Sequence, residues 1–226
     1  SEDLIFWKVA NSPYSKVVCN DRANMLYVTT NLRVIAELNA WEVIDKYLCE
    51  PTETHAKRIC LKFITSIGVS REFNRHRVAS IAEQSTRYCN YTKDKFNNEL
   101  TFIKPSWLDI PTGHYGYWDG DWCDVNEMKI QLPGEEHKDI DAFLWTLEDA
   151  EREYTLLINK GWQPQQAREI LPLTTATEVV YTAFEDDWKH FFDLRYRGTT
   201  GLPHPNAQQV ASIAHDLILK ELGKDL

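Results

Sequence analysis

The stretch from Arg75 to Arg87 reads RHRVASIAEQSTR and concentrates cationic and hydroxyl side chains in a chain that is otherwise acidic. Arg75, His76 and Arg77 are followed by seven residues and then by Ser85. The whole chain has 226 residues and a formal net charge of -9. Because duplex binding draws affinity from an extended basic surface, this short segment favours a phosphorylated small molecule over a nucleic acid. A solvated arginine face with ordinary ion pairs is the alternative interpretation.

The composition is that of a compact globular chain. Hydrophobic residues make up 43% of the sequence and aromatic residues 12%, which is enough for a substantial core. No linker rich in Pro, Gly or Ser divides the chain, so we predict one domain over residues 1–226, with a variable loop insert over residues 104–135. No apolar run reaches the roughly 20 residues of a membrane span, and Ser1-Glu2-Asp3 lacks the basic start of a signal peptide. We therefore expect a soluble, cytoplasmic protein.

Cysteine and histidine spacing argues against disulfides and metal sites. The five cysteines are an odd number, widely spaced and without a Cys-x-x-Cys pair, so we interpret them as reduced thiols. The seven histidines lack the His-x-x-x-His spacing of a metalloenzyme, and no metal site is expected.

Hydrophobic periodicity predicts the secondary structure on both sides of the arginine motif. Before the motif, it predicts a helix from Asn31 to Tyr47 and a strand over residues 59–69, with Ser70 capping a short helix through Asn74. After the motif, it predicts a helix over 135–159 closed by Gly161, a brief helix from Pro164, a strand over 174–184, and helices over 186–195 and 206–222. Helices and strands mix without a regular βαβ rhythm, which indicates the α+β class. The chain has no Gly-x-Gly-x-x-Gly loop, so a Rossmann dinucleotide site is not expected.

The order Arg-His-Arg, seven residues, Ser resembles the signature of the flavin-dependent thymidylate synthases. Further segments resemble elements of that family in the same order along the chain, over roughly residues 25–215. These segments are residues 27–33, Glu53-Thr54-His55 with the apolar run to Ile67, residues 167–172, residues 190–195, and His204-Pro205 before the last helix.

The resemblance implies an α+β fold with a mainly antiparallel sheet, assembled as a homotetramer whose active sites are shared between subunits. It implies an FAD enzyme that converts dUMP to dTMP, with methylenetetrahydrofolate as carbon donor and NADPH as reductant. No cysteine nucleophile is needed, and none of the five cysteines follows a proline as in conventional thymidylate synthases. No nucleic-acid or membrane partner is expected.

The resemblance also implies roles for individual residues. Arg195 matches the catalytic arginine, whose charge stabilises the negative charge that grows on the uracil when its C5 becomes electron-rich. The flavin contacts implied are Thr52, Arg75, His76, Arg77, Glu83 and His190. The nucleotide contacts implied are Glu72, Arg75, Gln84, Ser85, Thr86, Arg87, Arg168 and Arg195. The plainer alternatives are a helix-terminal arginine at position 195, a salt bridge from Arg168 to Glu169, and a core or surface histidine at position 76.

Several positions depart from the family pattern, among them Ala82, where an asparagine is frequent. Glu72 stands where a glutamine is expected, and its carboxylate should repel an anionic ligand unless Arg71 or Arg75 neutralises it. Phe184-Glu185-Asp186 replaces an Asn-x-Arg that touches the flavin, which leaves His190 as the clearer flavin contact on that helix.

Two other functions remain open from the sequence. One is a nucleotide-sensing module that keeps the phosphate-binding arginines and has lost turnover, which the presence of Arg195 disfavours. The other is a single-stranded nucleic-acid binder built from arginines and aromatic residues, which the net charge of -9 disfavours.

Overall fold

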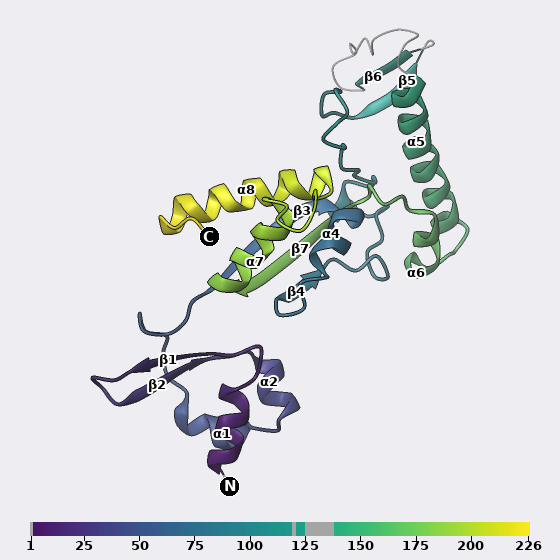
Figure 1. Cartoon of the computed structure of the whole chain (residues 1–226). Coiled ribbons are helices and arrows are strands. Elements are labelled where there is room, and N and C mark those ends of the chain that lie inside the picture. The colour runs from purple at the N-terminus through teal and green to yellow at the C-terminus, as the bar shows by residue number, and fades with distance from the viewer. Residues whose placement is uncertain (1, 119–120, 125–137) are drawn as a thin grey trace.

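The centre of the molecule is an antiparallel sheet of three strands in the order β3-β7-β4 (Figure 1). This computed structural model describes residues 2–118, 121–124 and 138–226. The strands are β3 (Arg58–Ser66), β7 (Ala176–Phe184) and β4 (Ser80–Glu83). β7 lies in the middle, with Phe63 opposite Val179 on one side and Ile81 opposite Tyr181 on the other. The antiparallel sheet and the mixture of helices and strands confirm the predicted α+β class.

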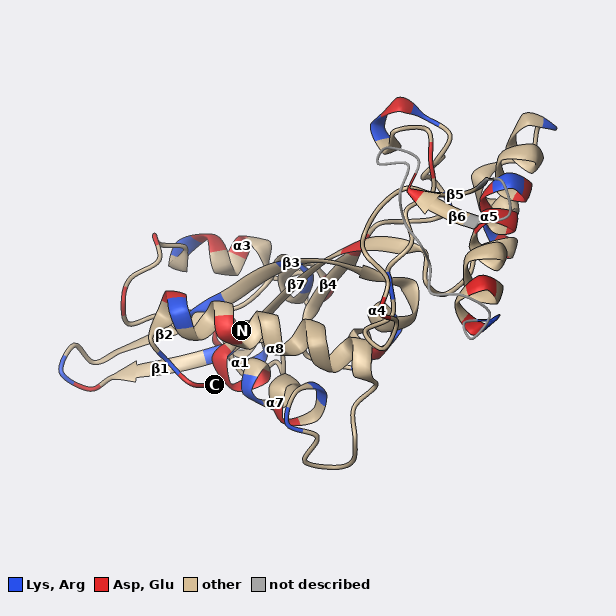
Figure 2. Cartoon of the chain, turned by 90° about the horizontal axis from the view of Figure 1, so that it is seen from above, with Lys and Arg blue, Asp and Glu red and all other residues tan. Residues whose placement is uncertain are grey.

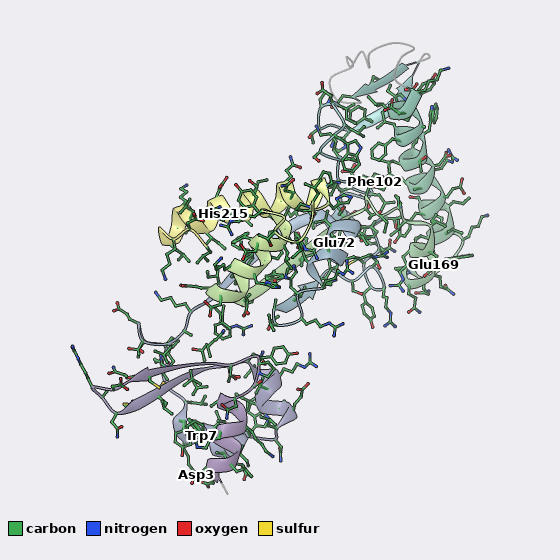
Figure 3. The ribbon with its side chains drawn as sticks, viewed as in Figure 1. Asp3, Trp7, Glu72, Phe102, Glu169 and His215 are labelled. Carbon is green, nitrogen blue, oxygen red and sulfur yellow. The ribbon has the colours of Figure 1, made fainter. Side chains whose placement is uncertain are left out.

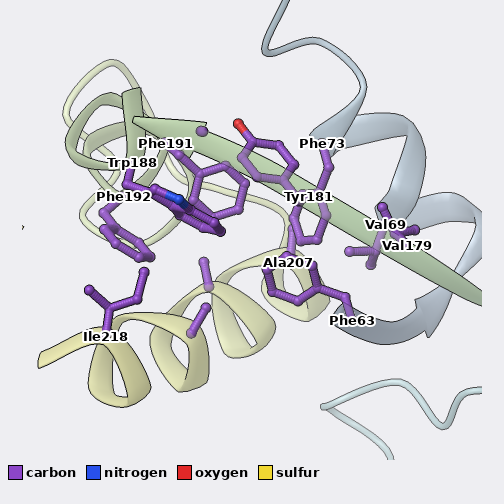
Figure 4. Packing of buried hydrophobic residues seen from close by; sticks show 13 residues of the cluster. Phe63, Val69, Phe73, Val179, Tyr181, Trp188, Phe191, Phe192, Ala207 and Ile218 are labelled. Atoms are coloured by element: carbon purple, nitrogen blue, oxygen red, sulfur yellow. The ribbon is translucent and has the colours of Figure 1, made fainter. Parts of the chain in front are cut away.

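Helices cover one face of this sheet. They are α4 (Ile67–Phe73), α7 (Glu185–Arg195) and α8 (Pro205–Leu222). Residues of β7 alternate, so that Val179 and Tyr181 are buried beneath the helices while Glu178 and Val180 are exposed on the opposite face. Aromatic rings from α7, among them Trp188, fill the space between sheet and helices (Figure 4). The core is therefore one-sided, and in the described part of the chain Glu178 and Val180 on the second face of the sheet are exposed.

The N-terminal segment forms a separate cluster of elements beside the sheet (Figure 1). Its elements are α1 (Glu2–Ala10), the hairpin β1 (Lys16–Asn20) and β2 (Met25–Thr29), α2 (Leu32–Glu37), α3 (Trp41–Ile44) and a 3-10 turn (Asp45–Tyr47). They enclose a small core of Val9, Val34, Ile35, Ala40 and Ile44. This cluster carries Arg33 toward the segment that follows α4, as described below.

A second group of elements lies at the other end of the sheet. It contains α5 (Lys138–Asn159), α6 (Pro164–Ala167), 3-10 turns over Asp94–Phe96 and Arg168–Ile170, and the hairpin β5 (Tyr115–Trp118) and β6 (Asp121–Asp124). In Figure 2, acidic residues predominate along α5. Within the described residues, no helix is long and apolar enough to span a bilayer.

The regular elements after residue 160 confirm the sequence-based predictions most closely. α6 begins at Pro164, and β7, α7 and α8 each begin within two residues of the predicted position. The long helix α5 also follows the prediction from Lys138 onward, and Gly161 at φ +93° lies just beyond its end. Residues 135–137 of the predicted helix lie outside the described residues.

Three predictions around the motif are wrong. The single helix over residues 31–47 is interrupted at Asn39, whose positive φ of 47° ends α2 before α3 begins. The strand predicted to reach residue 69 ends at Ser66, because the Ser66 hydroxyl accepts a hydrogen bond from Val69 N and starts α4 there. Ser70 is therefore inside the helix rather than at its cap.

The predicted insert over residues 104–135 is more ordered than a loop in its described part. β5 and β6 form an antiparallel hairpin there, with Tyr117 opposite Trp122. The Trp122 ring is buried and packs against Trp145 of α5 at 4.9 Å between centroids. Residues 119–120 and 125–135 of the insert lie outside the described residues.

Candidate functional site

Helix periodicity directs the side chain of Arg195 inward. Arg195 follows Trp188, Phe191 and Phe192 by seven, four and three residues, so it shares the face of α7 that carries these buried rings. Its side chain is only 14% exposed, although it is the last residue of the helix. The guanidinium therefore reaches the end of α4 instead of extending into solvent.

Arg195 is held there by three hydrogen bonds. Nε donates to His76 Nε2 at 3.1 Å, Nη1 donates to Glu72 Oε2 at 2.6 Å, and Nη2 donates to the backbone carbonyl of Glu72 at 3.0 Å. The guanidinium has five N–H donors, so two remain for a ligand. This arrangement makes Arg195 an oriented cationic donor at the end of α7.

His76 is neutral at physiological pH. It is buried, with 6% of its surface exposed. This burial, the positive charge of Arg195 and the neighbouring His190 lower the pKa of His76 to about 4. Because Nε2 accepts the hydrogen bond from Arg195, the ring proton lies on Nδ1. His76 is thus a hydrogen-bond acceptor for the arginine, with its donor nitrogen on the other side of the ring.

Two residues of the cationic triplet line a cavity of about 420 Å3. The side chains of His76 and Arg77 line it, together with Asn31 and Arg33 from the N-terminal cluster. Arg33 also forms an ion pair with Glu37, whereas Arg77 forms none within the described residues. No carboxylate belongs to the described lining, so this cavity favours an anion.

Arg75 and His190 lie at the edge of the same cluster. Arg75 Nη1 is 3.9 Å from Glu72 Oε2, and Arg75 is otherwise exposed. The ring of His190, on α7, is 5.9 Å from that of His76 and is also exposed. Arg75 and Arg195 together neutralise the charge of the Glu72 carboxylate. They therefore reduce the repulsion that a glutamate at this position is expected to exert on an anionic ligand.

Some of the residues implied as nucleotide contacts form a second cluster. Arg168 Nη1 donates to Thr86 Oγ1 at 3.3 Å, and Arg87 Nη2 donates to Gln165 Oε1 at 3.5 Å. Arg168 also forms the ion pair with Glu169, at 3.6 Å, that was its plainer alternative. Gln165 had no sequence signal beyond its place in the brief helix. In the parts of the chain that the structure describes, no hydrogen bond or ion pair links this cluster to Arg195.

The Glu83 carboxylate and the backbone N–H of Gln84 form hydrogen bonds with other groups of the protein. The Glu83 carboxylate accepts hydrogen bonds from Ser70 Oγ at 2.6 Å, Thr177 Oγ1 at 3.3 Å and Asn74 Nδ2 at 3.3 Å. Gln84 N donates to the backbone carbonyl of Glu178 at 2.8 Å, which extends the pairing of β4 with β7. Glu83 therefore ties α4 to two strands and positions the segment that carries Ser85, whose Oγ accepts from Arg87 N.

Thr52 lies in the segment that precedes β3. Its backbone N donates to His55 Nδ1 at 2.9 Å, and the His55 ring is 5.0 Å from Tyr27 of the N-terminal hairpin. Among the described residues, no contact joins Thr52 to the Arg75–Arg77 triplet. The structure thus gathers Arg195, Glu72, His76, Arg75 and His190 and leaves Thr52 apart.

A second cavity of about 580 Å3 was not anticipated from the sequence. Glu72 lines it, with Trp107, Phe143 and Asn206 among the other residues. These residues come from separate segments without a shared motif, so periodicity offered no signal for them. Within the described residues, no group of three or more His, Cys, Asp or Glu side chains is arranged to hold a metal ion, and all five cysteines are free thiols.

Comparison with known proteins assigns the family. The family described as thymidylate synthase complementing protein matches residues 51–221, so the chain belongs to that family. A flavin-dependent thymidylate synthase from Haloarcula marismortui is 29% identical over 137 residues, which are 57% of this chain and 51% of the relative. One from Pyrococcus furiosus is 31% identical over 121 residues, 54% of this chain and 38% of the relative. The chain thus matches about half of the first relative's length and less of the second's.

A solved structure shares the fold. The UMP/dUMP methylase PolB from Streptomyces cacaoi, bound with 5-Br dUMP, superposes with a TM-score of 0.51 and 20% sequence identity. The match covers 72% of this chain and 67% of PolB. At this identity the likeness concerns the fold.

Proposed function

We propose that the protein is a flavin-dependent thymidylate synthase that reductively methylates dUMP to dTMP, with methylenetetrahydrofolate as carbon donor and NADPH as reductant through FAD. The family membership and the relatives' names support this proposal. The observation that carries it is the held guanidinium of Arg195, which keeps two N–H donors that no described residue uses. Its partner His76 lines a cavity without carboxylates in its described lining. A cytoplasmic location is part of the proposal.

Arg195 is the catalytic residue in this proposal. When C5 of the uracil becomes nucleophilic, negative charge grows on the ring, and a guanidinium held in advance stabilises it without reorganising. His76 and Glu72 fix the orientation of Arg195, so that little rotamer entropy is lost when the substrate binds. Bound FAD supplies the reducing chemistry.

The anion-favouring cavity fits the diphosphate of a flavin dinucleotide. Arg77 offers a cation there that forms no ion pair with a described residue, and His76 offers the N–H of its Nδ1. We assign Arg75, His76, Arg77 and His190 to the flavin. We also assign Glu83, which acts by positioning the segment around it, and Thr52.

We assign the nucleotide to residues from both clusters. From the cluster around Arg195 these are Glu72, Arg75 and Arg195, and from the segment after β4 and the turn after α6 they are Gln84, Ser85, Thr86, Arg87 and Arg168. Within one chain these two clusters share no described contact. A homotetramer with shared active sites accounts for this separation. The uncovered sheet face, where Ile64 is 66% exposed, offers apolar surface for such an assembly.

The experiment is to purify the protein, record its absorbance spectrum and supply dUMP, methylenetetrahydrofolate and NADPH. We expect a yellow protein with flavin absorbance that forms dTMP. A folded protein that binds dUMP and never turns it over, with or without added FAD, would contradict the enzyme and support the nucleotide-sensing alternative. A protein that binds neither flavin nor dUMP would contradict both.

A further inference from the structure

Arg197 connects the end of α7 to α8 and to the segment beyond α8. Its Nη1 donates to Asp193 Oδ1 at 3.2 Å. Its Nη2 donates to Asp225 Oδ1 at 3.0 Å and to the backbone carbonyl of Leu226. The same Asp225 oxygen is 2.8 Å from His215 Nε2, and because a carboxylate oxygen only accepts, this nitrogen donates to it. We call these five residues the Arg197 cluster.

One side of the Arg197 cluster is anchored in the hydrophobic core. His215 is only 7% exposed, and its ring lies 5.0 Å from that of Phe192 and 5.1 Å from that of Tyr196. Leu226 packs against the same group of buried residues that contains Phe192. Ion pairs between two exposed side chains contribute little, but a network that includes a buried ring is held in one geometry.

The end of α7 is thereby held from two sides. Asp193 and Arg195 are two positions apart in α7, so their side chains point away from each other. Arg195 bonds Glu72 on α4, whereas Arg197 links Asp193 to the rest of the cluster. In Figure 3, His215 on α8 and Glu72 on α4 lie well apart. The last turn of α7 is therefore tied to α4 on one side and to α8 and the segment after it on the other.

The backbone that follows α7 transmits this restraint. The N–H groups of Tyr196 and Arg197 both donate to the carbonyl of Phe192, at 2.9 and 2.8 Å. The N–H of Thr199 donates to the carbonyl of Asp193 at 2.9 Å. A displacement of Arg197 is therefore passed through hydrogen bonds to the last turn of α7, which carries Arg195.

We propose that Arg197 is a positioning residue that acts through Arg195. By tying the end of α7 to α8 and to Asp225, it keeps the Arg195 guanidinium at its three hydrogen bonds. A misplacement of about 1 Å at a reacting group can lower a rate by about 100-fold, so an anchor on the far side of the helix affects the chemistry. The expected rates rest on the proposed function, whereas the position of Arg195 can be tested without it.

The first test measures dTMP formation by flavin-loaded variants. Arg197→Ala should lower kcat by about 10- to 100-fold. Arg197→Lys keeps the charge without the fork and should recover part of this loss, and Asp225→Ala should cost less than Arg197→Ala. Lys224→Ala is the matched control, because it breaks the 2.9 Å ion pair of the neighbouring residue with Glu185, at the start of α7 and away from Arg195. We expect it to keep the wild-type rate, and an equal loss in Lys224→Ala and Arg197→Ala would overturn the inference.

A comparison with the double variant tests the route of the effect. If Arg197 acts through Arg195, its removal has no further effect on the rate once Arg195 is absent. Arg197→Ala should therefore change kcat by less than about twofold when it is added to Arg195→Ala. The same 10- to 100-fold loss in both backgrounds would show that Arg197 acts independently and would overturn the inference.

A third measurement needs no turnover. Burial and the positive charge of Arg195 lower the pKa of His76 to about 4, so this pKa reports whether the guanidinium is in place. Titration of the histidine rings by NMR, in the protein as purified and without dUMP, should show a higher pKa of His76 in Arg197→Ala and an unchanged one in Lys224→Ala. Asp225→Ala, at a side chain that is 73% exposed, provides the same reading if Arg197→Ala does not fold.

The outcomes separate this inference from the proposed function. An unchanged pKa of His76 in Arg197→Ala and Asp225→Ala would overturn the inference, whether or not dTMP formation falls, and would leave the proposed function standing. A wild-type protein that forms no dTMP would overturn the proposed function, and the titration of His76 would still decide whether Arg197 positions Arg195.

Discussion

Arg195 Nε lies 3.1 Å from His76 Nε2, and this hydrogen bond exists only while the imidazole is neutral. The burial of His76 and the guanidinium beside it lower its pKa to about 4. The two residues are 119 positions apart in the sequence and join the end of α7 to the turn after α4. Protonation of His76 would therefore break the contact that orients the catalytic arginine.

The first prediction concerns stability and pH. In the unfolded chain His76 has its ordinary pKa of 6.5, and in the folded chain about 4, so between these values the unfolded state binds more protons. The free energy of unfolding should fall as pH is lowered through this window, by about 3 kcal/mol in total from this group. Urea unfolding of flavin-free protein at several pH values measures it. His76→Asn should flatten the slope, and the remaining pH dependence is then that of the other titrating groups.

The second prediction concerns catalysis by Arg195. Arg195→Ala should fold and keep its flavin, yet lose about 2.7–4 kcal/mol of transition-state stabilisation, or about 100- to 1,000-fold in kcat. Arg195→Lys keeps the charge but not the planar fork, so it should recover only part of the loss. Lys189→Ala, on the same helix and exposed, is the control. Wild-type rates of dTMP formation by Arg195→Ala would remove the arginine from the mechanism.

The third prediction concerns the flavin. The double variant His76→Ala with Arg77→Ala removes one hydrogen-bond donor and one cation from the cavity at the N-terminal cluster. We expect FAD to be lost on gel filtration or to bind at least about tenfold more weakly, since each charge-assisted hydrogen bond contributes about 1.5–3 kcal/mol. Arg22→Ala, in the exposed turn between β1 and β2, is the control. Unchanged flavin content in the double variant would place the cofactor elsewhere.

The fourth prediction tests the one-sided core. Trp188 is fully buried, and its Nε1 donates to the carbonyl of Ile59 at 3.2 Å. Trp188→Ala should lower the free energy of unfolding by about 3–5 kcal/mol through the cavity it leaves. Trp162→Ala, at a residue that is 46% exposed, should change it by less than about 0.5 kcal/mol. Equal midpoints for the two variants in urea would contradict the packing described here.

The sequence predicted elements well where the pattern was local and strong. The β-branched run before Phe184 and the amphipathic stripe of α8 each come from neighbouring residues, so periodicity is enough to locate them. The break at Asn39 depends on a single left-handed residue and was missed. β4 was also missed, because a four-residue strand within a polar motif has too few residues to show a period.

The site was predicted only through resemblance to a family. Periodicity places Arg195 on the inner face of α7, but its partner Glu72 is 123 residues away and comes from another element. The pairing depends on how α4 and α7 pack on the sheet, which no local pattern encodes. The separation of the nucleotide residues into two clusters likewise follows from packing.

The fifth prediction tests whether those two clusters meet across subunits. Arg87→Ala and Arg195→Ala should each be inactive when refolded alone, because every site then lacks one arginine. If the two proteins are unfolded, mixed equally and reassembled, a site is whole only when Arg87 comes from one variant and Arg195 from the other. In an equal mixture, the subunit that contributes Arg87 is the right variant with a probability of about one half, and so is the subunit that contributes Arg195. About a quarter of the wild-type rate of dTMP formation should therefore return. Native mass spectrometry verifies that hybrid oligomers form. Hybrids without activity would mean that both arginines act within one chain.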